Sequence, residues 1–225
     1  MSYVLRDHVS FCNADGRLVF LDIRKDRYFR LPNDLESGLL TYLDDRCGRN
    51  PVLDELVKIG VLVFKPGISH LSSPIVCPPA RSALEHSASS SILRRARMAR
   101  ATRALLTTRL QLKFTSLEST LRQLAAYRRM KIPPSVRMTA TTNDQALLQA
   151  TAEFMRVSRL FSTEGSCLPN SIALARFLAG EGLPVDVVLG VTGVPFSAHC
   201  WAQVEDIVLN DFVGNVQAHT PILVI

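Results

Sequence analysis

The chain has 225 residues, of which 47% are hydrophobic and 20% are charged, so it has enough apolar material to build a sizeable core. No apolar run approaches the ~18 residues of a transmembrane helix, and the N-terminus lacks the basic-then-apolar pattern of a signal peptide. The five cysteines form no CxxC pair, so we expect neither a metal site nor a disulfide framework. These features predict a cytoplasmic protein with no membrane partner.

The net charge of +6 is unevenly distributed along the chain. Residues 94–137 contain twelve Lys or Arg and one acid, a net charge of +11, which leaves −5 for the remainder. Such a block can bind nucleic acid, an anionic membrane or an acidic protein or peptide, or it can be a solvated helix face. Charge alone leaves these interpretations open.

Residues 1–68 are predicted to form a small module that begins with three strands. The segments 8–12, 17–23 and 27–31 are rich in β-branched and aromatic residues, and the Asp15-Gly16 pair is a hairpin turn signal. Both faces of the second segment are mostly apolar. We therefore expect this strand to be covered on both sides.

Two helices and a strand complete the first module. In "LPNDLESGLLTYLDD", Asn33 is the expected cap and Glu36 follows three residues later, as in a capping box. In "NPVLDELVKIG", Asn50 is the expected cap, Pro51 fits the first helical position and Gly60 ends the helix. The segment "VLVF" then predicts a short terminal strand.

This module resembles the PqqD-like precursor-recognition element of ribosomal peptide (RiPP) biosynthesis, through a strand that runs directly into a helix start in "YFRLPNDLESGLL". The resemblance implies a small winged-helix-like domain that binds an extended leader peptide along the strand edge 27–30, with the helix 51–59 as the groove wall. The candidate peptide contacts are Tyr28, Phe29, Leu53 and Val57. Each of the four can equally be a core residue.

Residues 69–93 are rich in Ser and Pro without an apolar period, which predicts a linker. Residues 94–225 are predicted to begin with helices, one of them in "TNDQALLQATAEFMRVSRLF" with Thr142 or Asn143 as cap. The segments "PVDVVLGV", "FSAHCWAQV" and "IVLNDFV" then predict strands. Helices followed by an antiparallel sheet indicate an α+β domain.

Cys167 opens the helix predicted in "CLPNSIALARFL", where Ser166 or Thr163 can provide the cap and Pro169 fits only in a first turn. A thiol at a helix N-terminus lies at the positive end of the helix dipole, which favours the thiolate. The free N–H groups of the same turn can bind a developing oxyanion. The alternative interpretation of Cys167 is a small buried hydrophobic residue.

A cysteine nucleophile needs a base, and the base needs an orienting group. His199 shares one strand face with Trp201, which we expect to be a core residue that shields the base from water, whereas Cys200 points away. A tight turn would place His199 opposite Asp211 in the next strand, and a turn shifted by half a residue would place Cys200 there instead. His219, near the C-terminus, is expected to be incidental.

The segments "SCLPNSIALARFLAGEGLPVDVVLGV", "FSAHCWAQVED" and "NDF" resemble the lasso-peptide B protein, a transglutaminase-like leader peptidase, over about residues 160–215. The shared pattern is a Cys-Leu-x-x-Ser-x-x-Leu helix, an Ala-His-x-Trp-x-x-Val strand and a following Asp. The resemblance implies a catalytic triad of Cys167, His199 and Asp211 on a transglutaminase/papain-like fold. Pro169-Asn170 departs from it, because many relatives have an Arg before the Ser.

The resemblance implies a cysteine peptidase without cofactors that binds the leader of a lasso precursor and cleaves at the leader–core junction. It also implies a partner, the asparagine-synthetase-like lasso cyclase, and no nucleic acid. Two alternatives remain open. A winged-helix nucleic-acid-binding regulator with a degenerate C-terminal domain would use the basic segment, although residues 1–68 contain ten acids and ten Lys or Arg. A transglutaminase-fold acyltransferase would use the same triad but pass the acyl group to an amine.

Overall fold

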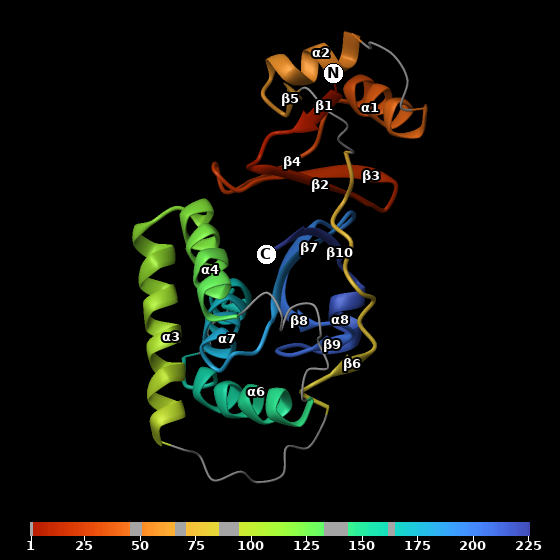
Figure 1. The fold of residues 1–225 in the computed structure, drawn as a ribbon. Coiled ribbons are helices and arrows are strands. Elements are labelled where there is room, and N and C mark those ends of the chain that lie inside the picture. Colours follow the sequence, from red (N-terminus) through yellow and green to blue (C-terminus); the bar gives the residue numbers. More distant parts are fainter. Residues whose placement is uncertain (1, 46–50, 66–70, 86–94, 133–143, 162–164) are drawn as a thin grey trace.

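The computed structural model describes residues 2–45, 51–65, 71–85, 95–132, 144–161 and 165–225. They form a mixed α/β fold in which a first module, residues 2–65, lies on one end of a second module, residues 71–225 (Figure 1). The caps expected at Asn50, Thr142, Asn143 and Thr163 fall outside the described residues.

The first module contains two small sheets. Their strands are β1 (Ser2–Leu5), β2 (Val9–Ala14), β3 (Arg17–Asp22), β4 (Arg27–Phe29) and β5 (Leu62–Lys65). β1 pairs with β5, and β2, β3 and β4 form an antiparallel sheet in that order. Asp15 and Gly16 make the turn between β2 and β3 with φ of 53° and 79°, the left-handed backbone that an Asp-Gly hairpin turn requires.

The helices α1 (Asn33–Asp45) and α2 (Pro51–Lys58) close the first module. The expected capping box is wrong, because the Glu36 side chain turns inward. One carboxylate oxygen of Glu36 accepts the Leu18 N–H at 2.6 Å, and the other accepts from Arg17 at 2.9 Å. Glu36 therefore ties α1 to β3 instead of closing the first turn of its own helix.

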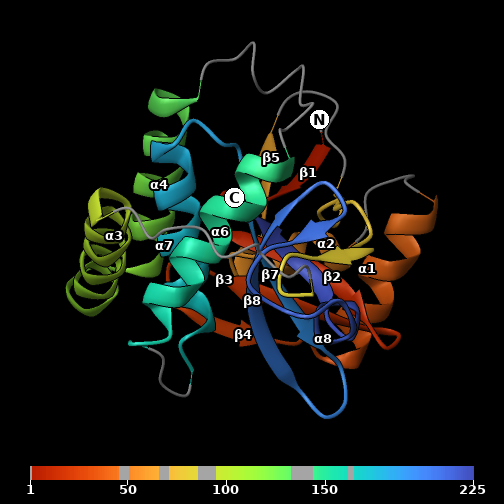
Figure 2. The ribbon, with the colours of Figure 1, turned by 90° about the horizontal axis from the view of Figure 1, so that it is seen from below.

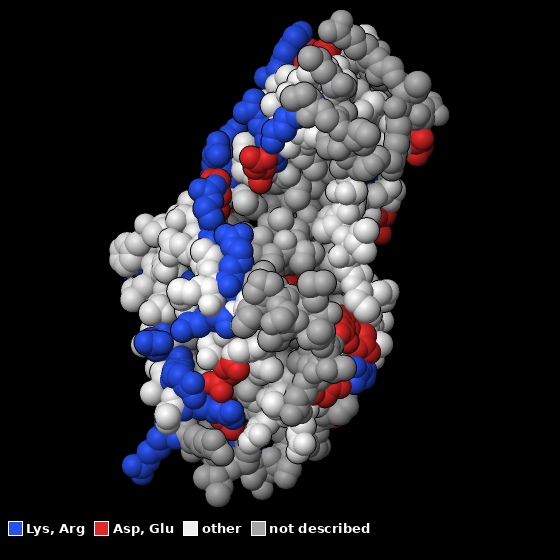
Figure 3. All heavy atoms as spheres, viewed as in Figure 1, with Lys and Arg blue, Asp and Glu red and all other residues white. Residues whose placement is uncertain are grey.

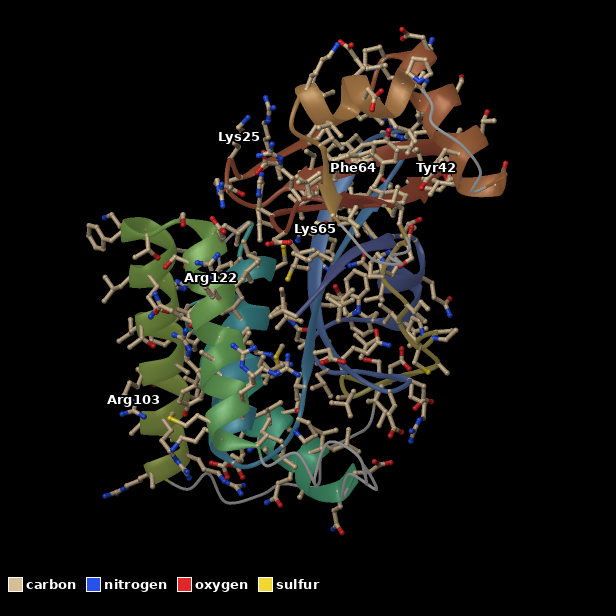
Figure 4. The ribbon with its side chains drawn as sticks, turned by 45° about the horizontal axis from the view of Figure 1, so that its top comes forward. Lys25, Tyr42, Phe64, Lys65, Arg103 and Arg122 are labelled. Atoms are coloured by element: carbon tan, nitrogen blue, oxygen red, sulfur yellow. The ribbon has the colours of Figure 1, made fainter. Side chains whose placement is uncertain are left out.

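The β1–β5 pair is fixed to both helices by an aromatic cluster. The ring of Tyr3 meets Tyr42 of α1 and Phe64 of β5 edge-on, with centroids 6.0 and 5.0 Å apart, and Figure 4 shows the latter two rings on the same module. The Tyr3 hydroxyl donates to Asp54 Oδ1 of α2 at 2.7 Å.

Strand β3 is covered on both sides, as its sequence predicts. Leu18 and Phe20 point into the core of the first module, with α1 and α2. Val19 and Leu21 point the other way, into the large core of the second module. In Figure 1 the β2–β4 sheet accordingly lies between the helices of the first module and the ends of β7 and β10. The two modules are therefore joined by buried side chains as well as by the chain itself.

The second module is a five-stranded sheet covered by helices. The strand order is β10-β7-β8-β9-β6, with β7 (Asp186–Thr192), β8 (Ser197–Val204), β9 (Ile207–Val208), β10 (Thr220–Val224) and β6 (Arg81–Ser82). The helices are α3 (Arg95–Phe114), α4 (Leu117–Lys131), α6 (Asp144–Ser158), α7 (Cys167–Gly180) and the short α8 (Val213–Gln217). The sequence predicted β7 and β8 but neither α8 nor β10.

Helix α7 is the centre of the second module (Figures 1 and 2). It contacts β7 and β8 on one side and α3, α4 and α6 on the other. Eight of its fourteen residues are buried, so it is apolar nearly all round, as expected of a helix enclosed by other elements. This enclosure gives the first turn of α7 a fixed position above β8.

Part of the segment expected to be a linker, residues 69–93, belongs to the second module. Arg81 and Ser82 form β6, which pairs in parallel with β9, and the N–H groups of Ala80 and Ala83 donate to Asp206 and Val208. Arg81 also pairs with Asp206 at 2.8 Å. A strand of two residues is too short to show an alternation of apolar and polar residues. The Ser and Pro content of residues 69–93 therefore predicted a linker and gave no indication of β6.

The basic segment forms α3 and α4, and much of its charge is paired within the molecule. Arg97 bridges Glu153 and Glu181 at 3.2 Å each, and its guanidinium is mostly buried. Others lie at the surface: Figure 3 shows a band of Lys and Arg along this side, and Figure 4 shows Arg103 extending outward from α3. Among the described helices, none has the length and apolar character needed to cross a membrane.

Candidate active site

The thiol of Cys167 lies half-buried at the first residue of α7, as predicted from the sequence. Ser166 occupies the N-cap but makes no side-chain capping hydrogen bond. Pro169, in the first turn, has no N–H group, so the position costs the helix no hydrogen bond. The N–H groups of Cys167 and Leu168 begin the helix, where no intrahelical partner exists for them.

Cys167 differs electrostatically from the other buried thiols. A hydrogen bond with the His199 side chain lowers the pKa of Cys167, and this outweighs the opposing effect of burial, helped by the N–H groups of Cys200 and Leu168. Burial raises the pKa of Cys12 to about 11 and also raises the pKa of Cys200. Cys167 is therefore the thiol that is prepared to ionise, and Cys200, which precedes Trp201 in β8, is a core residue.

His199 Nε2 is hydrogen-bonded to Asp211 Oδ2, which leaves Nδ1 for the thiol of Cys167. Burial favours protonation of Asp211, but hydrogen bonds from His199, the Phe212 N–H and Asn215 outweigh it and lower the pKa of this carboxyl. Asn215 Nδ2 donates to the same carboxylate oxygen at 2.9 Å. Asp211 is thus held as a carboxylate that orients the imidazole ring.

The imidazole and the thiol together form an ion pair. The hydrogen bond with Asp211 raises the pKa of His199 to about 9, and the interaction with Cys167 adds to the rise. Because the pKa of Cys167 is lowered while that of His199 is raised, the thiolate–imidazolium form is favoured near neutral pH. This is the resting state from which a cysteine nucleophile attacks a carbonyl.

The strand pairing that brings Asp211 to His199 is not the one expected. β8 and β9 pair Gln203 with Val208, a register that would place Cys200 opposite Asp211. The ladder ends before that point, because Asn210 Oδ1 takes the Ala202 N–H at 2.8 Å in place of a backbone carbonyl. The chain leaves the sheet there, and the Asp211 side chain reaches His199 from beyond the strand.

A hydroxyl beneath the site ties α7 to the sheet, and sequence reasoning gave it no role. Ser171 Oγ lies 2.8 Å from the Cys167 carbonyl and 3.0 Å from the Cys200 carbonyl, and it accepts from Asn210 Nδ2 at 2.9 Å. These contacts join the nucleophile helix, the histidine strand and the segment before Asp211. The feature of the sequence that could have indicated this role is the position of Ser171, one helical turn after Cys167.

A second support comes from β6 in the expected linker. Ser82 is fully buried, and its hydroxyl donates to the Asp211 carbonyl at 2.7 Å. Gln203 links the same region: its amide donates to the Cys77 carbonyl at 2.6 Å and accepts the Trp201 indole N–H at 2.8 Å. No local sequence pattern indicates the contacts of Ser82 and Cys77, because they join segments more than a hundred residues apart.

Two aromatic rings flank His199. Trp201 is 1% exposed and stacks near the imidazole, with centroids 6.1 Å apart, so the expected shielding role fits its position. Gly190 permits this, because a Cβ there would lie 2.7 Å from the Trp201 ring. His219 is not incidental to the site: its ring centroid lies 5.2 Å from that of His199, and its Nδ1 bonds to the Asn215 carbonyl.

The four expected peptide contacts do not form one surface. Leu53 is 0% exposed in the core of the first module, so its assignment to a peptide surface is wrong. Val57 is half-buried against the same core. Tyr28 and Phe29 are half-buried and line a cavity next to the second module. Only these two remain near a surface that adjoins the catalytic groups.

The residues at this site do not form a metal centre. Within the described part of the chain, no three His, Cys, Asp or Glu side chains gather as metal ligands. The chemistry that the described side chains support is nucleophilic attack by sulfur with acid–base help from an imidazole.

A thiol at a helix start followed by a His–Asp pair on a sheet is the catalytic arrangement of transglutaminase-like folds. The family model of the transglutaminase-like superfamily matches residues 73–224, and the chain belongs to this superfamily. The match begins eight residues before β6, which agrees with the place of that strand in the second module. Neither the curated proteins nor the solved structures gave a significant match to the chain.

Proposed function

We propose that this protein is a cysteine peptidase that cleaves the leader from a lasso-type precursor peptide. The observation that carries the proposal is the triad itself: a Cys167 thiol whose pKa is lowered by a His199 that Asp211 orients. The resemblance of residues 160–215 to the lasso-peptide B protein supplies the substrate class. The transglutaminase-like superfamily includes cysteine peptidases and acyltransferases, so both reaction types agree with the fold.

The proposed reaction begins from the ion pair. The Cys167 thiolate attacks the scissile carbonyl, and the N–H groups at the start of α7 stabilise the oxyanion. The His199 imidazolium gives its proton to the leaving amine, which departs as the core peptide with a free N-terminus. His199, now neutral, takes a proton from water, the hydroxide attacks the thioester, and the leader leaves as a carboxylate while the sulfur regains its charge.

The proposed leader-binding element is the free edge of β4 in the first module. β4 pairs with β3 on one side, and no described strand pairs with its other edge. An extended peptide can add there by main-chain hydrogen bonds. The proposed further partner is the asparagine-synthetase-like cyclase, which would receive the core, and the surface arginines of α3 and α4 are a candidate contact for it.

Mass spectrometry of the precursor peptide encoded beside the gene tests the proposal. The native protein is expected to cut it at one junction, and Cys167→Ala is expected to leave it intact while still binding the leader. Cys77→Ala is the matched control, because the Cys77 thiol is exposed and the substitution keeps the backbone carbonyl that Gln203 contacts, so cleavage should be unchanged. Equal cleavage by the native protein and Cys167→Ala would refute the proposed nucleophile.

The same experiment separates hydrolysis from acyl transfer. When a primary amine is added, a peptidase gives mainly the free leader acid, whereas an acyltransferase gives mainly the leader amide. The two products differ in mass and are read from one spectrum. A dominant amide product would replace the peptidase proposal with the acyltransferase one.

A further inference from the structure

A cavity of about 420 Å³ lies where the first module meets the turn between β7 and β8. It is lined on one side by Val19, Tyr28, Phe29 and Arg30, and on the other by Gly193, Val194 and Phe196. Tyr28 and Phe29 are consecutive strand residues whose side chains leave opposite faces of the sheet. Val19 and Tyr28 lie on the face of the sheet that is turned toward the second module, and Phe29 also reaches the cavity, so the cavity lies between that face and the β7–β8 turn and extends to β4.

The turn that forms the far wall is held in place by polar contacts with the first module. Asp15 Oδ2 accepts the N–H groups of Gly193 and Val194 at 3.0 and 3.2 Å, and Arg30 donates to the Gly193 carbonyl at 2.6 Å. Val194 is nevertheless 79% exposed and Phe196 51% exposed. Large apolar side chains that are both exposed and fixed are typical of a binding surface.

The cavity lies near the candidate catalytic groups. The Tyr28 ring meets Phe196 edge-on at 5.5 Å and packs against the same core cluster as Cys167. Burial raises the pKa of Tyr28 to about 12, and the nearby thiols of Cys200 and Cys167 add to the rise. Phe196 is the last residue of the turn, directly before β8, and precedes His199 by three residues, which span at most about 10 Å of extended chain.

We propose that this cavity is a specificity subsite that binds a large apolar side chain of the substrate, on the leader side and about three residues from the scissile bond. The inference rests on the proposed function and adds to it a sequence requirement close to the cut. A leader added to the free edge of β4 passes the cavity before it reaches Cys167. An extended peptide rises about 3.3 Å per residue, so the ~10 Å between Phe196 and His199 corresponds to about three residues.

Peptide probes that alkylate Cys167 test the subsite independently of turnover. The probes are acetylated tetrapeptidyl fluoromethyl ketones, in which the thiolate displaces fluoride, with Ala, Leu or Phe at each of the three positions before the reactive residue. In the native protein we expect Leu or Phe at one position to raise the alkylation rate constant about tenfold over Ala. Iodoacetamide, which has no peptide part, reports the reactivity of the thiol alone.

Phe196→Ala is the test variant, and Phe114→Ala is its control, because Phe114 is a 74% exposed phenylalanine at the end of α3. We expect Phe196→Ala to reduce the preference for the apolar residue to within about twofold and Phe114→Ala to retain it. The iodoacetamide rate should be the same in both variants, which shows that the site remains intact.

The outcomes distinguish this inference from the proposed function. Equal rates for Ala, Leu and Phe at all positions, with Cys167 still reacting rapidly with iodoacetamide, would overturn the subsite and leave the peptidase proposal standing. A preference that survives in Phe196→Ala would also overturn the subsite. If Cys167 reacts with iodoacetamide no faster than the exposed Cys77, the proposed function itself fails.

Discussion

At the scale of single residues, the reactivity of Cys167 depends on its neighbours. The thiol shares the chain with Cys12 and Cys200, which are buried in apolar surroundings, and only Cys167 meets an imidazole that a carboxylate orients. Its place at the start of α7 adds unpaired N–H groups and the helix dipole. Each of these effects stabilises the thiolate, so they act in the same direction.

The first prediction concerns pH. Alkylation of Cys167 by iodoacetamide should reach half its maximal rate at a pH below the usual thiol range of about 8.5. In Asp211→Asn the imidazolium loses its partner, so the pKa of His199 falls from about 9 and the ion pair weakens. The half-maximal pH should therefore rise toward the usual thiol value, as measured by mass spectrometry of the labelled protein. An unchanged profile in Asp211→Asn would show that the carboxylate does not act through His199.

The second prediction concerns Ser171. Its replacement by Ala removes the hydroxyl that joins the Cys167 and Cys200 carbonyls to Asn210. We expect the rate of cleavage to fall about tenfold, which corresponds to about 1.4 kcal/mol in activation free energy. Ser158→Ala, a buried helical serine remote from the site, should lower the melting temperature similarly without lowering the rate. Equal loss of activity in both variants would mean that Ser171 supports only the fold.

The candidate triad could be predicted from the sequence because its signals are local. The sequence alone shows a cysteine at a helix start, with Pro169 in the same turn. It also shows a histidine within an apolar strand. The contacts of Ser82 and His219 could not be predicted, because each depends on how a segment far along the chain is placed. Tertiary packing, and not propensity, positions these side chains.

At the scale of elements, strand β3 shows how a sequence pattern can specify two environments. Its alternating side chains enter two different cores, and its backbone is tied to α1 by the Glu36 carboxylate. The double coverage could be predicted from apolar residues on both faces. The role of Glu36 could not, because a Glu three residues after Asn33 matches the capping-box pattern equally well.

The third prediction concerns this carboxylate. Glu36→Ala leaves the buried Leu18 N–H without its acceptor, and we expect it to reduce the free energy of unfolding by about 1–3 kcal/mol. Glu55 is the control, because its ion pair with Lys58 is exposed to solvent. Glu55→Ala should change the free energy of unfolding by less than about 0.5 kcal/mol in the same denaturant titration. A similar small change in both variants would contradict the structural role of Glu36.

The β8–β9 hairpin shows the limit of reasoning about register. A tight turn was expected to pair His199 with Asp211 across the two strands. The two side chains are in contact, but the strand register is different and Asp211 lies beyond the strand. The side chain of Asn210 ends the ladder of backbone hydrogen bonds by accepting from the Ala202 N–H. In the sequence, an asparagine with this role cannot be distinguished from an ordinary loop asparagine. The contact between His199 and Asp211 therefore depends on the point at which the chain leaves the sheet.

At the scale of the whole molecule, the two modules share a core. Cys12, Ala14, Val19 and Leu21 of the first module are buried with the apolar residues of the second. Arg24 of the β3–β4 turn also meets Glu118 of α4 at 3.3 Å. The sequence predicted two modules but did not indicate this contact. Apolar residues on one face of a strand predict that the face is buried, but they do not show which other element covers it.

The fourth prediction tests the contact between the modules. A Cβ at Gly193 would lie 2.5 Å from Asp15 Oδ2 and 2.8 Å from the Ala14 carbonyl, so Gly193→Ala must push the turn away from the β2–β3 hairpin. We expect it to cost about 1–3 kcal/mol, or several degrees in melting temperature. Gly214→Ala is the control, because a Cβ at Gly214 would meet no other atom within 4 Å in the described part of the chain. Equal melting temperatures in the two variants would show that the modules are not coupled here.

The shared core has a consequence for how the two modules can be separated. A fragment that contains only residues 71–225 would expose the apolar face that Val19 and Leu21 cover, and we expect it to be less stable and more prone to aggregation than the whole chain. Proteolytic removal of the first module is therefore expected to disturb the arrangement of Cys167, His199 and Asp211 instead of leaving it intact. The first module is part of the folded unit that contains the candidate site, and not a separable attachment to it.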